Sequence, residues 1–267
     1  MSQNNRLGRR NGRNIVSHRV AIQSFTDFAI GVVLQRLSDR GHRSVGTEFS
    51  NAAVQAELHD VIWPLTDRYD LDAEAFSHTF AYSQLDSIVS DCAEDASRYP
   101  LQDPALENLD EVFYASNGFR ATVAYRIANA LLLMGVPVLP RTISGIAHSQ
   151  TGIDIHPGTS ISPGLFIDHG TGIAIGCTAV IGENVNLYNG VVLGTRSKPR
   201  KKVQGSTIQK RHPTIESGVS LYTSSFVGGD VVIGADATIG AYAFVCRDIE
   251  PGAVVLGKVD FEAAATV

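Results

Sequence analysis

Six polar residues suited to acid–base and ionic chemistry stand out in the second half of this 267-residue chain. They comprise three histidines, two aspartates and one arginine: Asp154, His156, Asp168, His169, Arg211 and His212. An imidazole moves protons near neutral pH, and a carboxylate beside it fixes its tautomer and stabilises the imidazolium. The pattern therefore indicates a general base, with His169 and Asp154 as the candidate pair.

No nucleophile-elbow motif and no paired catalytic serine accompany these residues. A covalent enzyme intermediate would need such an activated nucleophile. We therefore expect direct attack by a substrate from which His169 removes a proton. The cysteines Cys92, Cys177 and Cys246 lie far apart without a C-x-x-C motif, so neither a disulfide framework nor a thiolate metal site is indicated.

The element that must position these residues is a six-residue repeat. Aliphatic residues recur at every sixth position over 155–167, over 175–193 after a two-residue shift, and over 215–245, with small residues and glycines between them. A period of six fits neither an amphipathic helix nor an alternating strand. It fits a parallel β-helix in which each hexapeptide gives one short strand and three hexapeptides make one coil. Asp154 and His169 are three positions short of a full coil apart, so we expect them to meet at one edge.

The first half of the chain is helical in pattern. Apolar residues from Val20 to Leu37 recur with the spacing of an amphipathic helix, and further helices are predicted at about 51–66, 72–97 and 117–135. The fold class predicted is α+β, with an α-helical domain over 15–149 followed by a left-handed parallel β-helix over 150–257. Residues 1–14 hold four arginines and no acid, which predicts a disordered basic tail, with organelle targeting or an anionic surface as alternative roles. Residues 258–267 form a C-terminal tail.

The repeat is interrupted over residues 195–213. This segment has seven basic residues and no acidic one. An insertion in a solenoid forms a loop extruded from one face, often the binding face. It is either a solvated charged loop or an arm that grips an anionic ligand such as a phosphorylated cofactor.

Composition excludes several classes of protein. The chain is 44% hydrophobic and 18% charged, with a net charge of −5, which disfavours general nucleic-acid binding. Its longest apolar runs fall well short of the roughly 18 residues that a membrane span needs. Residues 1–16 lack the apolar segment of a secretory signal peptide. We expect a cytoplasmic protein that binds neither nucleic acid nor membrane.

Three motifs in order give the chain a family resemblance: G-I-D-I-H-P-G over 152–158, F-I-D-H-G-T-G over 166–172 and R-H-P-T-I over 211–215. Together with Asp103-Pro-Ala105 and the segment Gly118–Ile127 in the helical half, they resemble serine O-acetyltransferases, the first enzymes of cysteine biosynthesis. The resemblance covers roughly residues 95–255. It implies an acyltransferase that uses acetyl-CoA as co-substrate, acetylates L-serine, and holds no permanent cofactor or metal.

The resemblance assigns a role to each matching position. It implies that His169 is the general base and Asp154 its dyad partner. Asp168 and Asp103 would bind the ammonium group of the substrate amino acid. Arg211 would pair with its carboxylate, and His212 would line the same pocket.

The family binds coenzyme A in a groove between the β-helices of a trimer, and its helical domains often join two trimers. The resemblance thus implies a homotrimer or a dimer of trimers. The second run of hexapeptides supplies the cofactor wall that we expect: Tyr222, Thr223, Ser224, Ala241 and Ala243. Lys258 or the basic loop would meet the phosphates, and backbone N–H groups near Gly194 would stabilise the oxyanion.

Two departures from the family pattern bear on partners. The link before R-H-P is longer and strongly basic, and the C-terminal tail is short, ending in Val267 instead of Ile. The short tail disfavours a complex with O-acetylserine sulfhydrylase.

Three alternatives stay open. The first is an acyltransferase of the same fold acting on another small amino acid, an amino sugar or an alcohol. The second is a γ-type carbonic anhydrase, with zinc held between subunits by histidines from the set His148, His156, His169 and His212. The third is a non-catalytic assembly scaffold.

Overall fold

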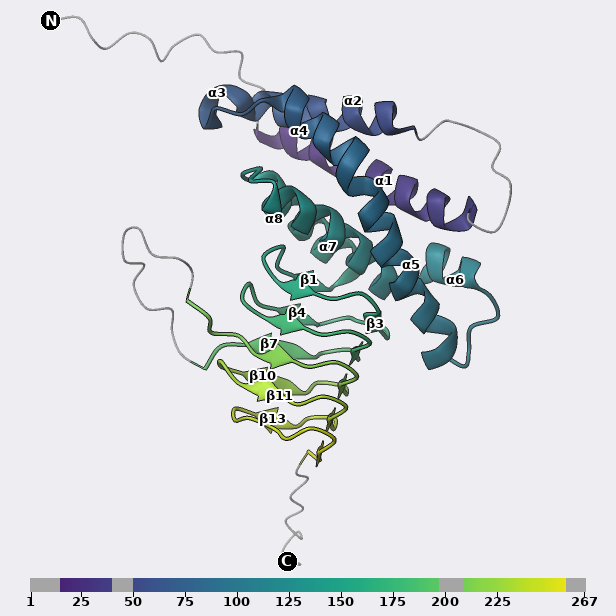
Figure 1. The fold of residues 1–267 in the computed structure, drawn as a ribbon, viewed down its shortest axis with the longest axis vertical. Coiled ribbons are helices and arrows are strands. Elements are labelled where there is room, and N and C mark those ends of the chain that lie inside the picture. The colour runs from purple at the N-terminus through teal and green to yellow at the C-terminus, as the bar shows by residue number, and fades with distance from the viewer. Residues whose placement is uncertain (1–14, 40–49, 197–208, 258–267) are drawn as a thin grey trace, which may run out of the picture.

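The computed structural model describes residues 15–39, 50–196 and 209–257. A group of helices lies above a stack of short strands, and the chain passes from the helices into the strands once (Figure 1). The predictions for residues 1–14, for the tail 258–267 with Lys258, and for most of the basic insertion lie outside the described residues.

The helical region ends at Thr151. Its longer helices are α1 (Ile15–Asp39), α2 (Asn51–Ile62), α5 (Leu85–Gln102), α7 (Asn117–Leu133) and α8 (Leu139–Thr151). The shorter ones are η1 (Trp63–Leu65), α3 (Thr66–Tyr69), α4 (Ala73–Thr79), η2 (Phe80–Gln84, a π-helical turn) and α6 (Leu109–Ala115). Side-chain oxygens accept hydrogen bonds from free backbone N–H groups where helices begin, as Ser116 does for α7 and Asp72 for α4.

The described strands form three parallel sheets. Sheet A is ordered β1-β4-β7-β10-β13, sheet B β2-β5-β8-β11 and sheet C β3-β6-β9-β12-β14. The chain visits A, B and C in turn, so each strand pairs with the one that lies a coil earlier. The predicted order, a helical N-terminal region followed by parallel strands, is confirmed. The strand bounds are β1 Asp154–Ile155, β2 Ser160–Ile161, β3 Phe166–Ile167, β4 Ala174–Ile175, β5 Val180–Ile181, β6 Asn186–Leu187, β7 Val192–Gly194, β8 Thr214–Ile215, β9 Ser220–Leu221, β10 Phe226–Gly228, β11 Val232–Ile233, β12 Thr238–Ile239, β13 Phe244–Val245 and β14 Val254–Val255.

Coil length varies, and the variation matters for the site. A regular coil spans three hexapeptides, as the pairing of Phe226 with Phe244 shows. The first coil is longer than this by two positions, because Asp154 pairs with Ala174. The coil that carries the basic insertion is nearly twice as long as the regular one, since Val192 pairs with Phe226. The strands on either side of the extra residues stay in phase.

Two apolar cores interlock at the junction between helices and strands. Phe166 of β3 packs into the helical core, whereas Ala121 and Tyr125 of α7 pack onto the interior of the strand coil. The Tyr125 hydroxyl donates to the carbonyl oxygen of Thr159 at 2.7 Å, and the Asn129 amide donates to that of Pro157 at 2.7 Å. Helix α7 therefore caps the first coil. No helix among the described ranges is long and apolar enough to cross a membrane.

Candidate active site

Two edges of the coil carry the predicted site residues. We call the connections β3–β4, β6–β7, β9–β10 and β12–β13 the C–A edge, and the connections β1–β2, β4–β5, β7–β8, β10–β11 and the turn after β13 the A–B edge. Asp168 and His169 lie on the C–A edge, and Arg211 and His212 lie on the A–B edge.

The corner after β3 presents an imidazole to solvent beside a carboxylate. His169 adopts a left-handed conformation with φ of 54°, and its side chain is 80% exposed. Its Nε2 lies 3.8 Å from Oδ1 of Asp168, whose side chain is 29% exposed. A positive φ is uncommon outside glycine, but other corners of this coil have it as well, at Asn184, Ser224 and Tyr242. The extra positions that lengthen the first coil fall here, so the imidazole projects from the edge.

The helical region fixes this corner from behind. The buried Tyr99 hydroxyl of α5 donates to the carbonyl oxygen of Ile167 at 3.4 Å, and burial raises the pKa of Tyr99. A Cβ atom on Gly118 of α7 would collide with the same carbonyl oxygen. Asp103, predicted to bind substrate, directly follows α5, four positions after Tyr99. Its Oδ1 accepts a hydrogen bond from the Ala105 N–H at 2.9 Å.

The predicted pairing of Asp154 with His169 stays a prediction. Among the described residues, Asp154 makes no side-chain hydrogen bond or ion pair with His169, and Asp168 is the carboxylate that approaches the ring. Asp154 pairs with Ala174, two positions later than a regular coil would place its partner. His169 thus lies at the corner, well before the strand residue that Asp154 faces.

On the A–B edge, His212 is buried against the backbone of the coil above it. Its Nδ1 accepts a hydrogen bond from the Thr178 N–H at 3.2 Å, and its ring occupies the space where Gly176 lacks a side chain. Burial lowers the pKa of His212, and the charges of Arg211 and Lys210 lower it further. Lys210 donates to the carbonyl oxygens of Thr178 at 2.9 Å and His212 at 2.5 Å, which anchors the end of the insertion.

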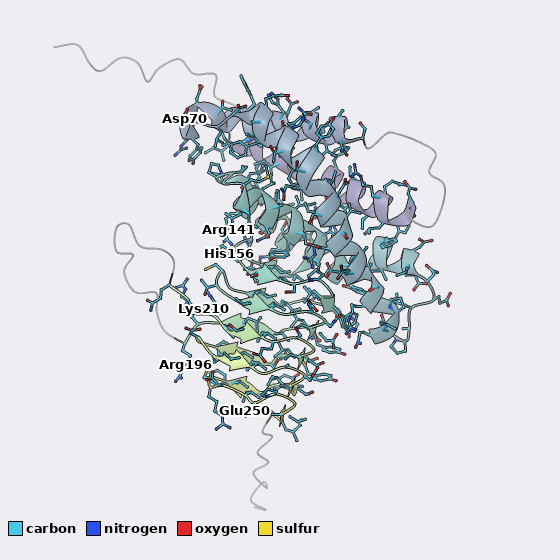
Figure 2. All side chains as sticks on the ribbon, viewed as in Figure 1. Asp70, Arg141, His156, Arg196, Lys210 and Glu250 are labelled. Atoms are coloured by element: carbon cyan, nitrogen blue, oxygen red, sulfur yellow. The ribbon has the colours of Figure 1, made fainter. Side chains whose placement is uncertain are left out.

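His156 occupies the same edge one coil above Gly176, and Arg141 of α8 lies near it (Figure 2). Burial lowers the pKa of His156 to about 4, the charge of Arg141 adds to this, and Asp154 opposes it. Its Nδ1 accepts a hydrogen bond from the Gly158 N–H at 2.9 Å. No three His, Cys, Asp or Glu side chains in the described part of the chain lie close enough together to hold a metal ion.

The acidic and basic halves of the predicted site thus stand at different edges of one chain. Asp168 and His169 precede sheet A, whereas Arg211 and His212 follow it. No contact joins the two groups within the described residues. A single site that contains both requires the C–A edge of one protomer to face the A–B edge of another.

The residues predicted to bind cofactor divide in the same way. Tyr222, Thr223 and Ser224 form a corner of the C–A edge, where the Tyr222 ring stacks on that of Tyr188 at 4.8 Å. Ala241 is exposed at the next corner. Gly194 ends β7 on the A–B edge, and its carbonyl oxygen accepts from the Gly229 N–H at 3.1 Å.

Ala243, also predicted to bind cofactor, does not offer its side chain to a ligand. It is 3% exposed and belongs to the interior of the coil. Its N–H donates to Gly240 and its carbonyl oxygen accepts from Phe226, so its backbone is occupied as well. The physical reason is the hexapeptide phase: Ala243 occupies an inward position just before β13, whose Val245 also points inward.

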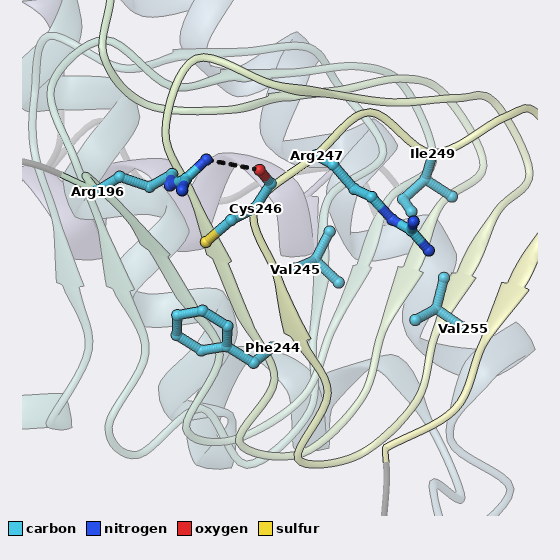
Figure 3. Close-up of a pocket in the computed structure, with 7 residues that line it drawn as sticks. All are labelled: Arg196, Phe244, Val245, Cys246, Arg247, Ile249 and Val255. Carbon is cyan, nitrogen blue, oxygen red and sulfur yellow. Dashed lines mark hydrogen bonds between the residues drawn. The ribbon is translucent and has the colours of Figure 1, made fainter.

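Sequence reasoning missed a pocket at the far end of sheet A (Figure 3). It is formed by Arg196, Phe244, Val245, Cys246, Arg247, Ile249 and Val255. The signal available in the sequence was the pair Phe226 and Phe244 at outward strand positions, where β4 and β7 carry Ala174 and Val192.

Comparison with known proteins places the chain among parallel-coil acyltransferases. It is 38% identical to a plasmid-encoded serine acetyltransferase of Synechococcus elongatus over 188 residues, which is 69% of this chain and 59% of the relative. It is also 38% identical over 168 residues to a serine acetyltransferase of Helicobacter pylori, covering 63% of this chain and 94% of the relative. No family model matches the chain.

A solved structure agrees over most of the chain. Serine acetyltransferase 1 of Entamoeba histolytica, crystallised with L-cysteine, is 28% identical with a TM-score of 0.68, covering 90% of this chain and 99% of that one. The present chain spans about three fifths of the length of two Synechococcus relatives. The chain belongs to the serine acetyltransferase family.

Proposed function

We propose that this protein transfers the acetyl group of acetyl-CoA to the hydroxyl of L-serine and so forms O-acetylserine for cysteine biosynthesis. The observation that carries the proposal is the corner at Asp168 and His169, where an exposed imidazole stands beside a carboxylate. The relatives' names supply the acceptor. The L-cysteine in the Entamoeba structure supports it, because cysteine differs from serine only by sulfur in place of oxygen.

The reaction proceeds by direct attack. His169 takes the proton of the serine hydroxyl, and the oxygen attacks the thioester carbonyl carbon to give a tetrahedral oxyanion. The carbon–sulfur bond then breaks, and the thiolate leaves with the proton from the imidazolium. Backbone N–H groups near Gly194 stabilise the oxyanion. Acetyl-CoA is a co-substrate, and no permanently bound cofactor takes part.

The acceptor is held by opposite charges. Arg211 pairs with the serine carboxylate, and His212 lines the same pocket. Asp168 and Asp103 bind the ammonium group. Asp168 is the carboxylate within reach of His169, and Asp154 is the partner inferred from the family. Comparing kcat of Asp168→Asn with that of Asp154→Asn assigns the dyad role, because the true partner's variant loses the larger factor.

The assembly follows from the two edges. We propose a left-handed coil that forms a homotrimer, or a dimer of trimers through the helical region, with each site built from the C–A edge of one protomer and the A–B edge of the next. The parallel coil and the separation of Asp168 from Arg211 support this arrangement. We place the protein in the cytoplasm.

The test is release of free CoA from acetyl-CoA, measured with a thiol reagent in the presence and absence of L-serine. A panel of amino acids, amino sugars and simple alcohols follows, with succinyl-CoA as a second donor. We expect serine-dependent release from acetyl-CoA. Faster release with another acceptor would replace serine, and no release with any acceptor would overturn the proposal.

A further inference from the structure

The segment that carries Arg211 and His212 returns to the coil beside a single threonine. Thr178 lies in the turn between β4 and β5 on the A–B edge, 33 and 34 positions before these two residues. The insertion separates them in the sequence, so they are neighbours only in the folded coil. Every polar group of Thr178 contacts this segment.

The Thr178 hydroxyl holds the backbone of both residues. Its Oγ1 accepts hydrogen bonds from the N–H groups of Arg211 at 3.0 Å and of His212 at 3.1 Å. The same Oγ1 lies 2.7 Å from Nδ1 of the His212 ring. A hydroxyl has two lone pairs and one proton. Both lone pairs are used by the backbone, so the proton is donated to Nδ1.

These contacts set the tautomer of His212. Its Nδ1 accepts hydrogen bonds from the Thr178 hydroxyl and from the Thr178 N–H, the latter at 3.2 Å. Both donors need the lone pair of Nδ1, so the ring proton is on Nε2. Nε2 lies beside Gly176, where a Cβ atom would collide with it. Among the described residues no hydrogen bond engages this nitrogen, so its N–H can donate to a ligand.

Lys210, on the same side of the coil as His156 (Figure 2), adds a second tie. Its ammonium group donates to the carbonyl oxygens of Thr178 at 2.9 Å and His212 at 2.5 Å. The N–H, hydroxyl and carbonyl groups of Thr178 are therefore all bound to residues 210–212. This one turn residue fixes where the end of the insertion meets the coil.

The Arg211 side chain has a hydrogen bond left to make. Its Nε is buried and has no hydrogen-bond partner within the described part of the chain. A buried donor without a partner costs free energy, which a bound acceptor recovers. Guanidinium groups bind planar carboxylates especially well. Arg211 and His212 thus offer donors from neighbouring residues whose backbones one hydroxyl holds.

We propose that Thr178 is a positioning residue of the acceptor site, which sets Arg211 and His212 in place to receive the carboxylate of the amino acid. The proposal rests on the proposed function. Thr178 acts through the two backbone N–H groups and through Nδ1, without touching the acceptor. Loss of its hydroxyl leaves both N–H groups without that partner and frees the imidazole to turn.

The experiment compares the wild type with Thr178→Val, which keeps the shape and removes the hydroxyl, and with Thr178→Ser, which keeps the hydroxyl. Thr238→Val is the matched control, because Thr238 is a half-buried threonine within β12 and on neither edge. Rates are measured with L-serine and with L-serinamide, whose neutral amide replaces the carboxylate. Urea unfolding checks each fold, and Thr178→Ala replaces Thr178→Val if valine overcrowds the turn.

We expect Thr178→Val to raise the KM for L-serine by about tenfold, as buried groups without partners predict. The kcat at saturating L-serine stays unchanged, because the lost interaction is one of binding. The kcat/KM for L-serinamide stays unchanged as well, because this acceptor lacks the carboxylate. Thr178→Ser and Thr238→Val behave as the wild type.

Two measurements do not depend on turnover. Calorimetry should show that Thr178→Val binds L-serine about tenfold more weakly than the wild type does. Nitrogen-15 spectra of the histidine rings should show a bare Nδ1 and a protonated Nε2 for His212 in the wild type. Its signals are assigned by their loss in His212→Asn, and a protonated Nδ1 would overturn the inference.

Equal losses with L-serine and L-serinamide, or wild-type affinity for L-serine in Thr178→Val, overturn the inference while serine acetylation stands. If the wild type acetylates a different amino acid, the proposed function fails, and the same comparison with that amino acid and its amide decides the role of Thr178. An acceptor without a carboxylate overturns both.

Discussion

Arg126 of α7 grips Asp95 of α5 at the junction between the helices and the strand coil. Nε lies 2.6 Å from Oδ2 and Nη2 lies 2.8 Å from Oδ1, and Asp95 is fully buried. The same carboxylate accepts the N–H groups of Gly164 and Leu165 at 2.9 Å each. Burial opposes the charge of Arg126, but its hydrogen bonds and attraction to Asp95 prevail and raise the pKa of the guanidinium. This pair ties two helices to the corner between β2 and β3.

Replacing Arg126 by Met should lower the free energy of unfolding by about 3–5 kcal/mol, because a buried carboxylate then lacks its partner. Urea unfolding measures the change. Asp95→Asn combined with Arg126→Met should recover much of the loss, since Asn keeps an oxygen for the two N–H groups without the charge. A single variant as stable as the wild type would contradict this role.

Gly118→Ala should destabilise the protein by about 1–3 kcal/mol, as overpacking does. The added methyl collides with the carbonyl oxygen of Ile167, so it also displaces the His169 corner and should lower kcat. Gly145→Ala in α8 is the matched control, because nothing lies within 4 Å of its Cβ position. That variant should gain up to about 1 kcal/mol from helix propensity. Equal melting temperatures for the two variants would refute the prediction.

Gly176→Ala should displace the His212 ring, whose space the methyl would occupy. Since Gly176 is not among the residues with positive φ, the backbone itself accepts alanine. We expect a loss of about 1–3 kcal/mol in stability and a higher KM for serine. Adding His212→Ala removes the collision and should restore stability without restoring activity. Urea unfolding and serine titrations separate the two effects, and a second substitution that restores nothing would show that the ring is not the cause.

His169→Ala should lower kcat by about 10²–10⁴-fold, the contribution of a positioned base. The fold should be unaffected because the side chain is 80% exposed. Initial rates with saturating acetyl-CoA measure the effect, and circular dichroism checks the fold. Near-normal turnover in the folded variant would remove His169 from the mechanism.

If each site is shared between two protomers, the His169→Ala variant should also be rescued by a second inactive variant. Mixed with Arg211→Ala during refolding, His169→Ala should regain activity, because some interfaces then pair an intact C–A edge with an intact A–B edge. Random assembly in a closed trimer gives about a quarter of the sites. Two inactive variants that stay inactive after verified mixing would place the whole site in one chain.

The free energy of unfolding should fall as the pH drops from about 6.5 towards 4, because His156 binds a proton less readily in the folded protein than in the unfolded chain. Its pKa is lowered to about 4 in the folded protein, against about 6.5 in the unfolded chain. The unfolded state therefore binds the extra proton first, and stability present above about pH 6.5 is lost as the pH falls towards 4. His156→Asn keeps an acceptor for the Gly158 N–H but cannot titrate. Its unfolding free energy, measured at several pH values, should vary less with pH than that of the wild type.

The strand coil was predictable from the sequence because its rule is simple. An aliphatic side chain at every sixth position points into the interior of the coil. Ile155, Leu187 and Ile239 are buried there. The family motifs likewise located the corner at Asp168 and His169. Helix α8 was missed because Pro137 and Pro140 suggest a loop, although Leu139 and Ile143 have helical spacing.

Two features of the site lay beyond sequence reasoning. The phase between Asp154 and His169 depends on the first coil, which exceeds the regular length by two positions. The pocket brings Arg196 next to Phe244 and Val255. Arg196 lies before the insertion and the other two lie after it, so they are neighbours only in the folded coil. Neither residue spacing nor composition reports where separate coils overlap.

The register on either side of the insertion has an evolutionary consequence. Val180 pairs with Thr214 across the whole inserted segment, yet Thr214 pairs in turn with Val232 in the phase of the regular coils. Lengthening such a corner costs only the entropy of a longer closure, about 0.6 kcal/mol for each doubling. The inserted segment can therefore change in sequence and length while the strand pairing on either side of it is kept. Selection on what the edge recognises and selection on folding act on separate stretches of the gene.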